Sequence, residues 1–194
     1  MKPVATGCTG AASDHANEDV AALIAASNVT APIDLINPYC FEPAMAPHLA
    51  ARQTGTEVSL ERIRESYLAL TGRADRVVVE GAGGLLVPLN MREDFRDLVE
   101  SLQIPVVLVV GMRLGCLNHA RLTAEALRAR GLPFAGWVAN RIDSGMTCFD
   151  ENLDTLRTML PAPLIAVIPF APDDASASGA INVDLLLEMA LPSA

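Results

Sequence analysis

The sequence predicts an α/β fold in which a parallel sheet is flanked by helices, and its length suits a single domain over residues 1–194. Two observations predict this fold. Four continuous apolar runs of strand length are rich in β-branched residues, which is typical of strands covered on both faces. Segments with helical spacing lie between these runs, joined to them by short loops, as in a parallel sheet. The four expected strands cover residues 76–79, 105–110, 134–139 and 164–168.

The helices are expected from their ends and from their apolar stripes. Ser59 has the side chain of an N-cap, and Gly72 is the residue type that commonly follows the end of a helix. The apolar residues at 95, 98, 99 and 102 are spaced i, i+3, i+4, i+7 and therefore share one helical face. Further helices are expected over residues 17–26, 117–129 and 148–160, and the chain begins with at most a short strand, Lys2-Pro3-Val4.

Composition argues against several classes of protein. The formal net charge of −9 has the wrong sign for a nucleic-acid or anionic-membrane binder, and the aromatic content of 4% leaves little for stacking on bases. No targeting segment and no apolar stretch of membrane-spanning length is found, so we expect a cytoplasmic protein. The four cysteines are widely spaced and form no C-x-x-C pair, so we expect reduced thiols instead of disulfides or a metal cluster.

A carboxylate followed by glycines is the first candidate site. Glu80 ends an apolar run and is followed by Gly81-Ala82-Gly83-Gly84. Phosphate-binding α/β proteins hold Mg²⁺ near a nucleotide with such a carboxylate, and glycines let backbone N–H groups approach an anion. The alternative is a strand-to-loop turn with a solvated glutamate. Three glycines in four positions weaken a fold unless close approach is needed, so the whole motif favours a binding site.

Two charged residues near the start of the chain are further candidates. Lys2 is the single lysine beside thirteen arginines, and it precedes a loop of small residues that would lie at the same edge of the sheet as Glu80. Taken alone, a terminal lysine is more often simply solvated. Asp19 lies in the first turn of an expected helix, where an acidic side chain is favourable anyway, but it could supply a second carboxylate for a metal.

Two positions later in the chain have features of binding sites. The segment from Gly111 to Asn118 leads from an expected strand into a helix, whose first N–H groups would suit a carboxylate. Asn140 follows another strand, where its side-chain amide could contact a purine edge.

The chain contains, in this order, the motifs M-K-P-V-A-T-G, N-P-Y-x-F-x-x-P-x-x-P-H, V-E-G-A-G-G, V-G-x-R-L-G-C-x-N-H and G-W-V-A-N. Together they resemble the dethiobiotin synthetase family, and the resemblance runs from Lys2 to about Pro169. The resemblance implies a homodimer of P-loop NTPase-like folds. It implies that ATP and CO₂ convert a diaminononanoate into dethiobiotin with Mg²⁺. An amine captures CO₂ as a carbamate, the carbamate takes the γ-phosphoryl group, and the second amine closes the ring and expels phosphate.

The resemblance also implies roles for individual residues. Lys2 matches the family's catalytic lysine, and Thr6 matches its hydroxyl near the diamine. Asp19 and Glu80 match the Mg²⁺ carboxylates. The nucleotide phosphates lie along Glu80, Gly81, Ala82 and Gly83, and the adenine lies near Asn140, Arg141, Pro169, Phe170 and Ala171. The substrate's carboxylate tail is received by the partner subunit's helix start, at positions matched by Gly115, Cys116, Leu117 and Asn118.

The sequence also departs from the family pattern. Family members begin with a strand, a G-x-x-x-x-G-K-[ST] loop and a helix, and a chain whose single lysine is Lys2 has no such loop. We therefore expect a start placed too late or a truncated fragment, which alone would neither bind ATP nor form dethiobiotin. Arg141 stands where the family commonly has an acidic residue. Two alternatives remain: a non-catalytic remnant that binds a partner, and a related P-loop ligase with another acid substrate.

Overall fold

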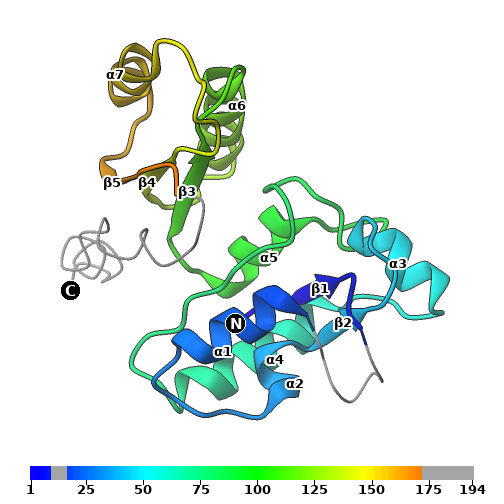
Figure 1. Cartoon of the computed structure of the whole chain (residues 1–194). Coiled ribbons are helices and arrows are strands. Elements are labelled where there is room, and N and C mark those ends of the chain that lie inside the picture. The colour runs from blue at the N-terminus through cyan, green and yellow to red at the C-terminus, as the bar shows by residue number, and fades with distance from the viewer. Residues whose placement is uncertain (10–16, 172–194) are drawn as a thin grey trace. The chain divides into compact units, whose positions relative to one another are not determined.

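A computed structural model describes residues 1–9 and 17–171, which form two compact units, Met1–Leu102 and a second unit that begins at Gln103 (Figure 1). The expectation of one domain stays a prediction. Residues 173–179, whose nucleotide contacts are not assigned from the sequence, lie outside the described residues. Within the described ranges, none of the helices combines the length and the apolar character that a membrane span requires.

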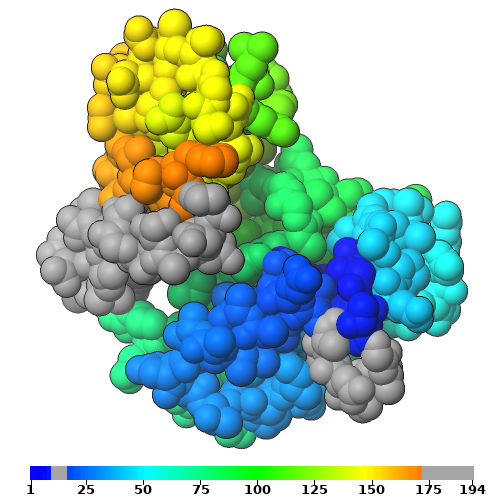
Figure 2. Space-filling model, in the orientation of Figure 1, coloured from blue at the N-terminus to red at the C-terminus, as the bar shows by residue number. Residues whose placement is uncertain are grey.

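The first unit is built on a short parallel sheet. β1 (Val4–Thr6) pairs with β2 (Tyr39–Phe41), with Val4 opposite Tyr39 and Thr6 opposite Phe41. The helices of this unit are α1 (Glu18–Ala26), α2 (Ile33–Ile36), α3 (Pro47–Gln53), α4 (Leu60–Thr71) and α5 (Phe95–Leu102). Most residues of α1 are exposed, and this helix forms part of the blue surface in Figure 2.

The helix ends in this unit follow from local side-chain chemistry. Asn17 caps α1, and Ser59 caps α4 by accepting a hydrogen bond from the Arg62 backbone N–H. The predictions for these two helices and for α5 are confirmed. Three elements, α2, β2 and α3, were not predicted, because they are too short to show a clear hydrophobic period.

The second unit contains a three-stranded parallel sheet in the order β3-β4-β5, formed by β3 (Val106–Gly111), β4 (Phe134–Asn140) and β5 (Leu164–Ile168). Its helices are α6 (Cys116–Ala129) and α7 (Phe149–Met159), and all five elements lie within about one residue of their predicted bounds. The core contains Trp137 of β4, Ala120 of α6 and Leu156 of α7. The predicted α/β class with parallel pairing is therefore confirmed.

Burial of the strands differs from the prediction in two places. Residues 76–79 are not a strand, and the backbone hydrogen bonds near them run to Met1, which precedes β1. The Met1 nitrogen donates to the Val78 carbonyl, and the Glu80 N–H donates to the Met1 carbonyl. Val78 is 69% exposed, and Val109 of β3 is 59% exposed. Val109 lies on an outer strand of its sheet, where fewer neighbours cover the side chains than on β4.

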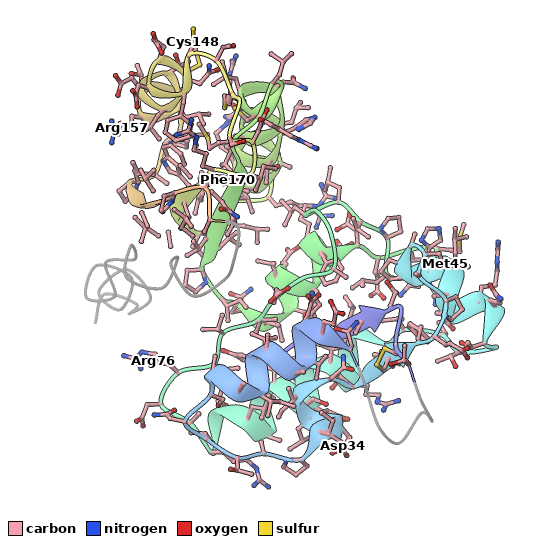
Figure 3. All side chains as sticks on the ribbon, in the orientation of Figure 1. Asp34, Met45, Arg76, Cys148, Arg157 and Phe170 are labelled. Carbon is pink, nitrogen blue, oxygen red and sulfur yellow. A yellow bond between two sulfur atoms is a disulfide. The ribbon has the colours of Figure 1, made fainter. Side chains whose placement is uncertain are left out.

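The prediction that all four cysteines are reduced is wrong for Cys8 and Cys40, which form a disulfide with Cα atoms 6.0 Å apart (Figure 3). Parallel pairing of β1 and β2 brings them together, because Cys40 lies opposite Ala5 and the Cys8 N–H donates to the Phe41 carbonyl at 3.0 Å. Cys116 and Cys148 are free thiols, as predicted; Cys116 is buried and Cys148 is exposed.

We expect reduction to destabilise the first unit. A cross-link between cysteines 32 positions apart removes chain entropy from the unfolded state worth about 3–4 kcal/mol. Cys40→Ser should therefore lower the thermal unfolding midpoint, whereas Cys148→Ser, at an exposed free thiol, should leave it nearly unchanged. Thiol titration of the denatured, unreduced protein should find only Cys116 and Cys148. Four reactive thiols before reduction would show that the disulfide does not form in solution.

Candidate functional site

Lys2 is fixed by its backbone before its side chain makes any contact. Its N–H donates to the Ile36 carbonyl at 2.8 Å, and its carbonyl accepts from the Asn37 side-chain amide at 2.6 Å. The following residue, Pro3, accepts from the Tyr39 N–H at 3.2 Å. The start of β1 is thus held against the segment that leads into β2, so the direction of the Lys2 side chain is determined by backbone contacts.

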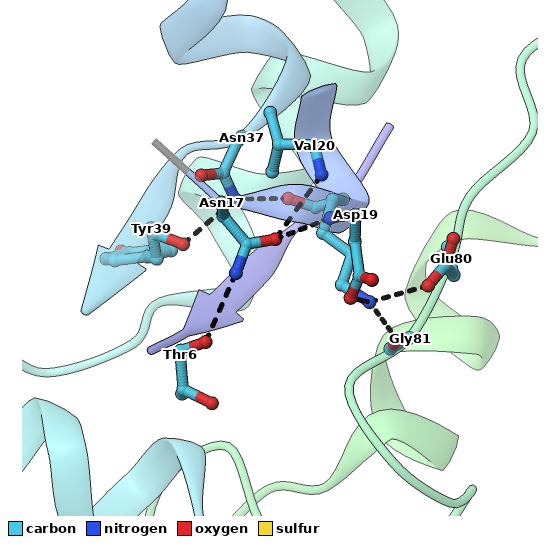
Figure 4. A network of polar contacts seen from close by, with 9 residues as sticks. Thr6, Asn17, Asp19, Val20, Asn37, Tyr39, Glu80 and Gly81 are labelled. Carbon is cyan, nitrogen blue, oxygen red and sulfur yellow. Dashed lines mark hydrogen bonds and ion pairs between the residues drawn. The ribbon is translucent and has the colours of Figure 1, made fainter. Parts of the chain in front are cut away.

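The Lys2 ammonium has three oxygen partners on two other segments of the first unit (Figure 4). Its Nζ lies 2.7 Å from Asp19 Oδ2 and 2.7 Å from Glu80 Oε1, and it donates to the Gly81 carbonyl at 3.0 Å. The Lys2 side chain is 5% exposed, whereas those of Asp19 and Glu80 are 54% and 47% exposed. The cluster is therefore a buried cation beneath two carboxylates that are open to solvent.

The pKa of Lys2 reflects this environment. Burial is the largest single influence and lowers the pKa, because it disfavours the charged form. The hydrogen bonds and charges of Asp19 and Glu80 act in the opposite direction, and together they raise the pKa of Lys2 above its usual value. The ammonium form is thus the form that the folded protein favours at neutral pH.

The glycine turn after Glu80 has one position that requires glycine. Gly83 has φ +81°, in the left-handed region, and a Cβ there would lie 3.1 Å from Val87 Cγ2. Gly81 is exposed and directs its carbonyl oxygen at Lys2, while Ala82 is half-buried. Thr6 ends β1 in the same unit, and its carbonyl accepts a hydrogen bond from the Asn17 side chain at 3.2 Å. The structure therefore brings Lys2, Asp19, Glu80 and Gly81 together, with Thr6 linked to this group through Asn17.

In the second unit, the start of α6 follows a left-handed residue. Gly115 has φ +96° and provides no side-chain cap, so the Leu117 and Asn118 N–H groups precede the first intrahelical hydrogen bond. Cys116 differs from these two residues. Its side chain is 1% exposed, and its N–H donates to the Arg113 carbonyl at 3.0 Å, so neither group faces a ligand.

The predicted adenine-side residues lie at the carboxyl ends of neighbouring strands. Asn140 ends β4 opposite Ile168 of β5, and the Arg141 N–H donates to the Ile168 carbonyl at 3.0 Å. The Arg141 guanidinium lies 4.8 Å from the centre of the Phe149 ring. The residues that follow β5 are Pro169, Phe170 and Ala171, with Phe170 47% exposed (Figure 3). This part of the second unit therefore gathers the residues predicted to flank adenine.

Comparison with known proteins identifies the family. A family model described as an AAA domain (AAA_26) matches residues 1–177. The ATP-dependent dethiobiotin synthetase BioD of Aromatoleum aromaticum is 52% identical over 169 residues, which cover 87% of this chain and 75% of the relative. The synthetase of the same name from Pseudomonas paraeruginosa is 48% identical over 185 residues, 95% of this chain and 81% of the relative. The chain belongs to the dethiobiotin synthetase family.

Membership of the dethiobiotin synthetase family confirms the resemblance, the ligase class and the P-loop NTPase-like fold predicted from the sequence. The parallel sheets flanked by helices agree with the AAA-domain match. A solved chain of the MinC:MinD cell division protein complex of Aquifex aeolicus is also similar. It has 13% identity and a TM-score of 0.48, with 97% of this chain and 73% of that chain covered.

Two asparagines of the site were not predicted from the sequence. Asn37 is fully buried, and its amide donates to the carbonyls of Lys2 and Tyr39. Asn17 caps α1 and also contacts Thr6. An asparagine before the acidic residues of an expected helix is a recognisable N-cap signal, so the cap itself was predictable. The contacts that both amides make with β1 depend on tertiary structure, and no local pattern predicts them.

The raised pKa of Lys2 gives a prediction for this family member. As the single lysine, Lys2 will give one ¹³Cε signal in protein labelled at lysine, and that signal should titrate above 10.5. The ion pairs then stabilise the fold fully below the unfolded pKa, and their contribution is lost as pH rises through the folded pKa. Asp19→Asn and Glu80→Gln should each lower the pH at the midpoint of the Lys2 titration, because each removes a negative charge that favours the ammonium form.

Glu57→Gln is the matched control for this titration, because Glu57 is an exposed carboxylate of the same unit that is paired with Arg92. Glu57→Gln should leave the titration midpoint of the Lys2 signal unchanged. A wild-type midpoint at or below 10.5 would contradict the ion pairs described here.

Proposed function

We propose that the chain catalyses the ATP- and Mg²⁺-dependent formation of dethiobiotin from a diaminononanoate and CO₂, a step of biotin biosynthesis. The observation that carries the proposal is the buried Lys2 ammonium between two half-exposed carboxylates, next to a glycine turn. The names of the relatives support the reaction class, because they are ATP-dependent dethiobiotin synthetases.

The donor set of the cluster fits Mg²⁺. Asp19 Oδ2 and Glu80 Oε1 each lie 2.7 Å from the same Lys2 nitrogen, so the two carboxylates converge on one point, as ligands of a single ion must. No third His, Cys, Asp or Glu joins them among the described residues. This suits Mg²⁺, which usually takes one or two carboxylates and fills its other positions with water and substrate phosphates.

In the proposed reaction, one amine of the substrate adds to CO₂ and loses a proton to give a carbamate. A carbamate oxygen then takes the γ-phosphoryl group of ATP, which releases ADP and leaves a mixed anhydride. The second amine attacks the anhydride carbon, closes the ring and expels phosphate. Every step carries negative charge on oxygen, and a fixed ammonium such as that of Lys2 can neutralise it without reorganising. The metal, when bound, supplies further neutralisation of the phosphate oxygens.

An anion that approaches Lys2 must replace one of its present partners. All three donors of the ammonium are used, by Asp19, Glu80 and Gly81. A cation that draws the two carboxylates away from Lys2 would release donors for the carbamate and the γ-phosphate. We therefore propose that the ammonium passes from the carboxylates to the substrate anion when metal and nucleotide bind.

The remaining predicted residues complete the proposed binding sites. We assign Thr6 to the diamine, with Glu80, Gly81, Ala82 and Gly83 along the nucleotide phosphates. In a homodimer, the α6 start of the partner subunit would receive the substrate's carboxylate tail, mainly through the N–H groups of Leu117 and Asn118 and with Gly115 permitting the turn. Cys116 offers no exposed group for this role. The adenine would lie near Asn140, Arg141, Pro169, Phe170 and Ala171.

A cytoplasmic location is part of the proposal, because ATP is the proposed co-substrate. The Cys8–Cys40 disulfide would be unusual in that compartment, where thiols are generally kept reduced. The thiol titration described above therefore also bears on the location.

Removal of either carboxylate should abolish the metal site. Mn²⁺ is a paramagnetic substitute for Mg²⁺, and bound between Asp19 and Glu80 it should broaden the single Lys2 ¹³Cε signal. Asp19→Asn and Glu80→Gln should remove this broadening at the same Mn²⁺ concentration. In the intact enzyme, each should reduce turnover by roughly a hundredfold or more, the scale of losing one charge-stabilising group.

Glu57→Gln is again the control for the metal experiment, and it should retain both the broadening and the activity. Unchanged broadening, turnover and Mg²⁺ dependence in the Asp19 and Glu80 variants would remove both residues from the proposed site.

Lys2→Gln should reduce turnover more than it weakens substrate binding, because the proposed charge neutralisation increases towards the transition state. We expect kcat to fall by roughly 10²–10³-fold in the intact enzyme, with a much smaller change in KM. Steady-state kinetics with varied diamine and ATP measures both constants. An effect confined to KM would make Lys2 a binding residue and contradict its catalytic role.

A further inference from the structure

The side chain of Asn17 makes contacts in two directions (Figure 4). Its Oδ1 accepts from the Asp19 N–H at 3.1 Å and from the Val20 N–H at 3.3 Å, which caps α1. Its Nδ2 donates to the Thr6 carbonyl at 3.2 Å, at the end of β1. One amide thus joins the helix that carries Asp19 to the strand that carries Lys2 and Thr6.

Helix capping explains only half of this arrangement. A cap requires one side-chain oxygen, and serine, threonine or aspartate supplies it about as well as asparagine. Ser59 shows this in the same unit, because it caps α4 with its hydroxyl oxygen alone. The donor group of Asn17 is therefore not needed to start α1, and its contact with Thr6 requires a separate explanation.

Asp19 needs an external constraint on its position. Its side chain is 54% exposed and lies in the first helical turn, where helix ends fray, yet its carboxylate lies 2.7 Å from Lys2 Nζ. The Asn17 amide fixes the Asp19 backbone N–H on one side and the end of β1 on the other. The distance between Asp19 and Lys2 is thereby fixed through a bridge of two hydrogen bonds.

We propose that Asn17 is a positioning residue that keeps the start of α1 against β1, so that the Asp19 carboxylate stays beside Glu80, where the two carboxylates bind one divalent cation. This inference rests on the proposed function, in which Asp19 and Glu80 hold Mg²⁺. Outer-shell partners of this kind orient metal ligands, and their loss typically weakens metal binding by roughly 10–100-fold.

Two substitutions separate the bridge from the cap. Asn17→Ser keeps an oxygen acceptor for the helix N–H groups but is too short and has no amide to reach Thr6. Asn17→Ala loses both the cap and the bridge. Ser59→Ala is the matched control, because it removes a cap of the same unit that has no contact with β1.

The experiment measures the thermal unfolding midpoint of each variant and its apparent Mn²⁺ affinity, from the broadening of the Lys2 ¹³Cε signal. We expect Asn17→Ser to retain most of the thermal stability and to lose roughly 10–100-fold in Mn²⁺ affinity. Asn17→Ala should lose both thermal stability and Mn²⁺ affinity. Ser59→Ala should lower only the unfolding midpoint and leave the Mn²⁺ affinity as in the wild type.

The outcomes distinguish this inference from the proposed function. Wild-type Mn²⁺ affinity in Asn17→Ser, together with weakened affinity in Asp19→Asn, would overturn the positioning role and leave the metal site standing. If Asp19→Asn also kept the wild-type Mn²⁺ affinity, both the positioning role of Asn17 and the proposed metal site would be overturned. An equal loss of affinity in Ser59→Ala would attribute the effect to general destabilisation and would also overturn the positioning role.

Discussion

The first unit depends on one buried ammonium. A charge with 5% exposure is costly unless it is paired, and Lys2 is paired with two carboxylates and a carbonyl oxygen. These partners come from α1 and from the glycine turn, which lie far apart in the sequence. The need to neutralise Lys2 therefore determines where both segments lie relative to β1. Loss of either carboxylate would remove a charge partner and loosen the segment that carries it.

The strand that carries Lys2 is short and is supported from both sides. A two-stranded sheet is marginal by itself, and β1 and β2 share only three paired positions. Asn37 binds the Lys2 carbonyl from the β2 side, and the Met1 backbone contacts Val78 and Glu80 on the other side. The Cys8–Cys40 disulfide joins the end of β1 to β2. This support gives the ammonium a fixed position, which stabilisation of developing charge requires.

Local chemistry in the sequence determined much of the fold and the candidates for the site. The caps at Asn17 and Ser59 start α1 and α4 because each supplies an oxygen to the first helical N–H groups. The apolar runs of the second unit become β3, β4 and β5, because continuous β-branched runs of this length suit strands that are covered on both faces. The unusual single lysine and the carboxylate before three glycines were also visible, as was the family, because these signals lie within a few consecutive residues.

Contacts between distant segments decided the rest. The disulfide requires the register that places Cys40 opposite Ala5, and cysteine spacing contains no information about that register. Whether residues 76–79 form a strand depends on what lies beside them, and Met1 is the residue whose backbone pairs with Val78 and Glu80. The sequence could propose Asp19 and Glu80 for one metal site and Lys2 for the same edge of the sheet, but only tertiary structure shows that both carboxylates contact one ammonium. The sequence determines such residues one at a time, whereas long-range pairing, which folding alone provides, determines their distances.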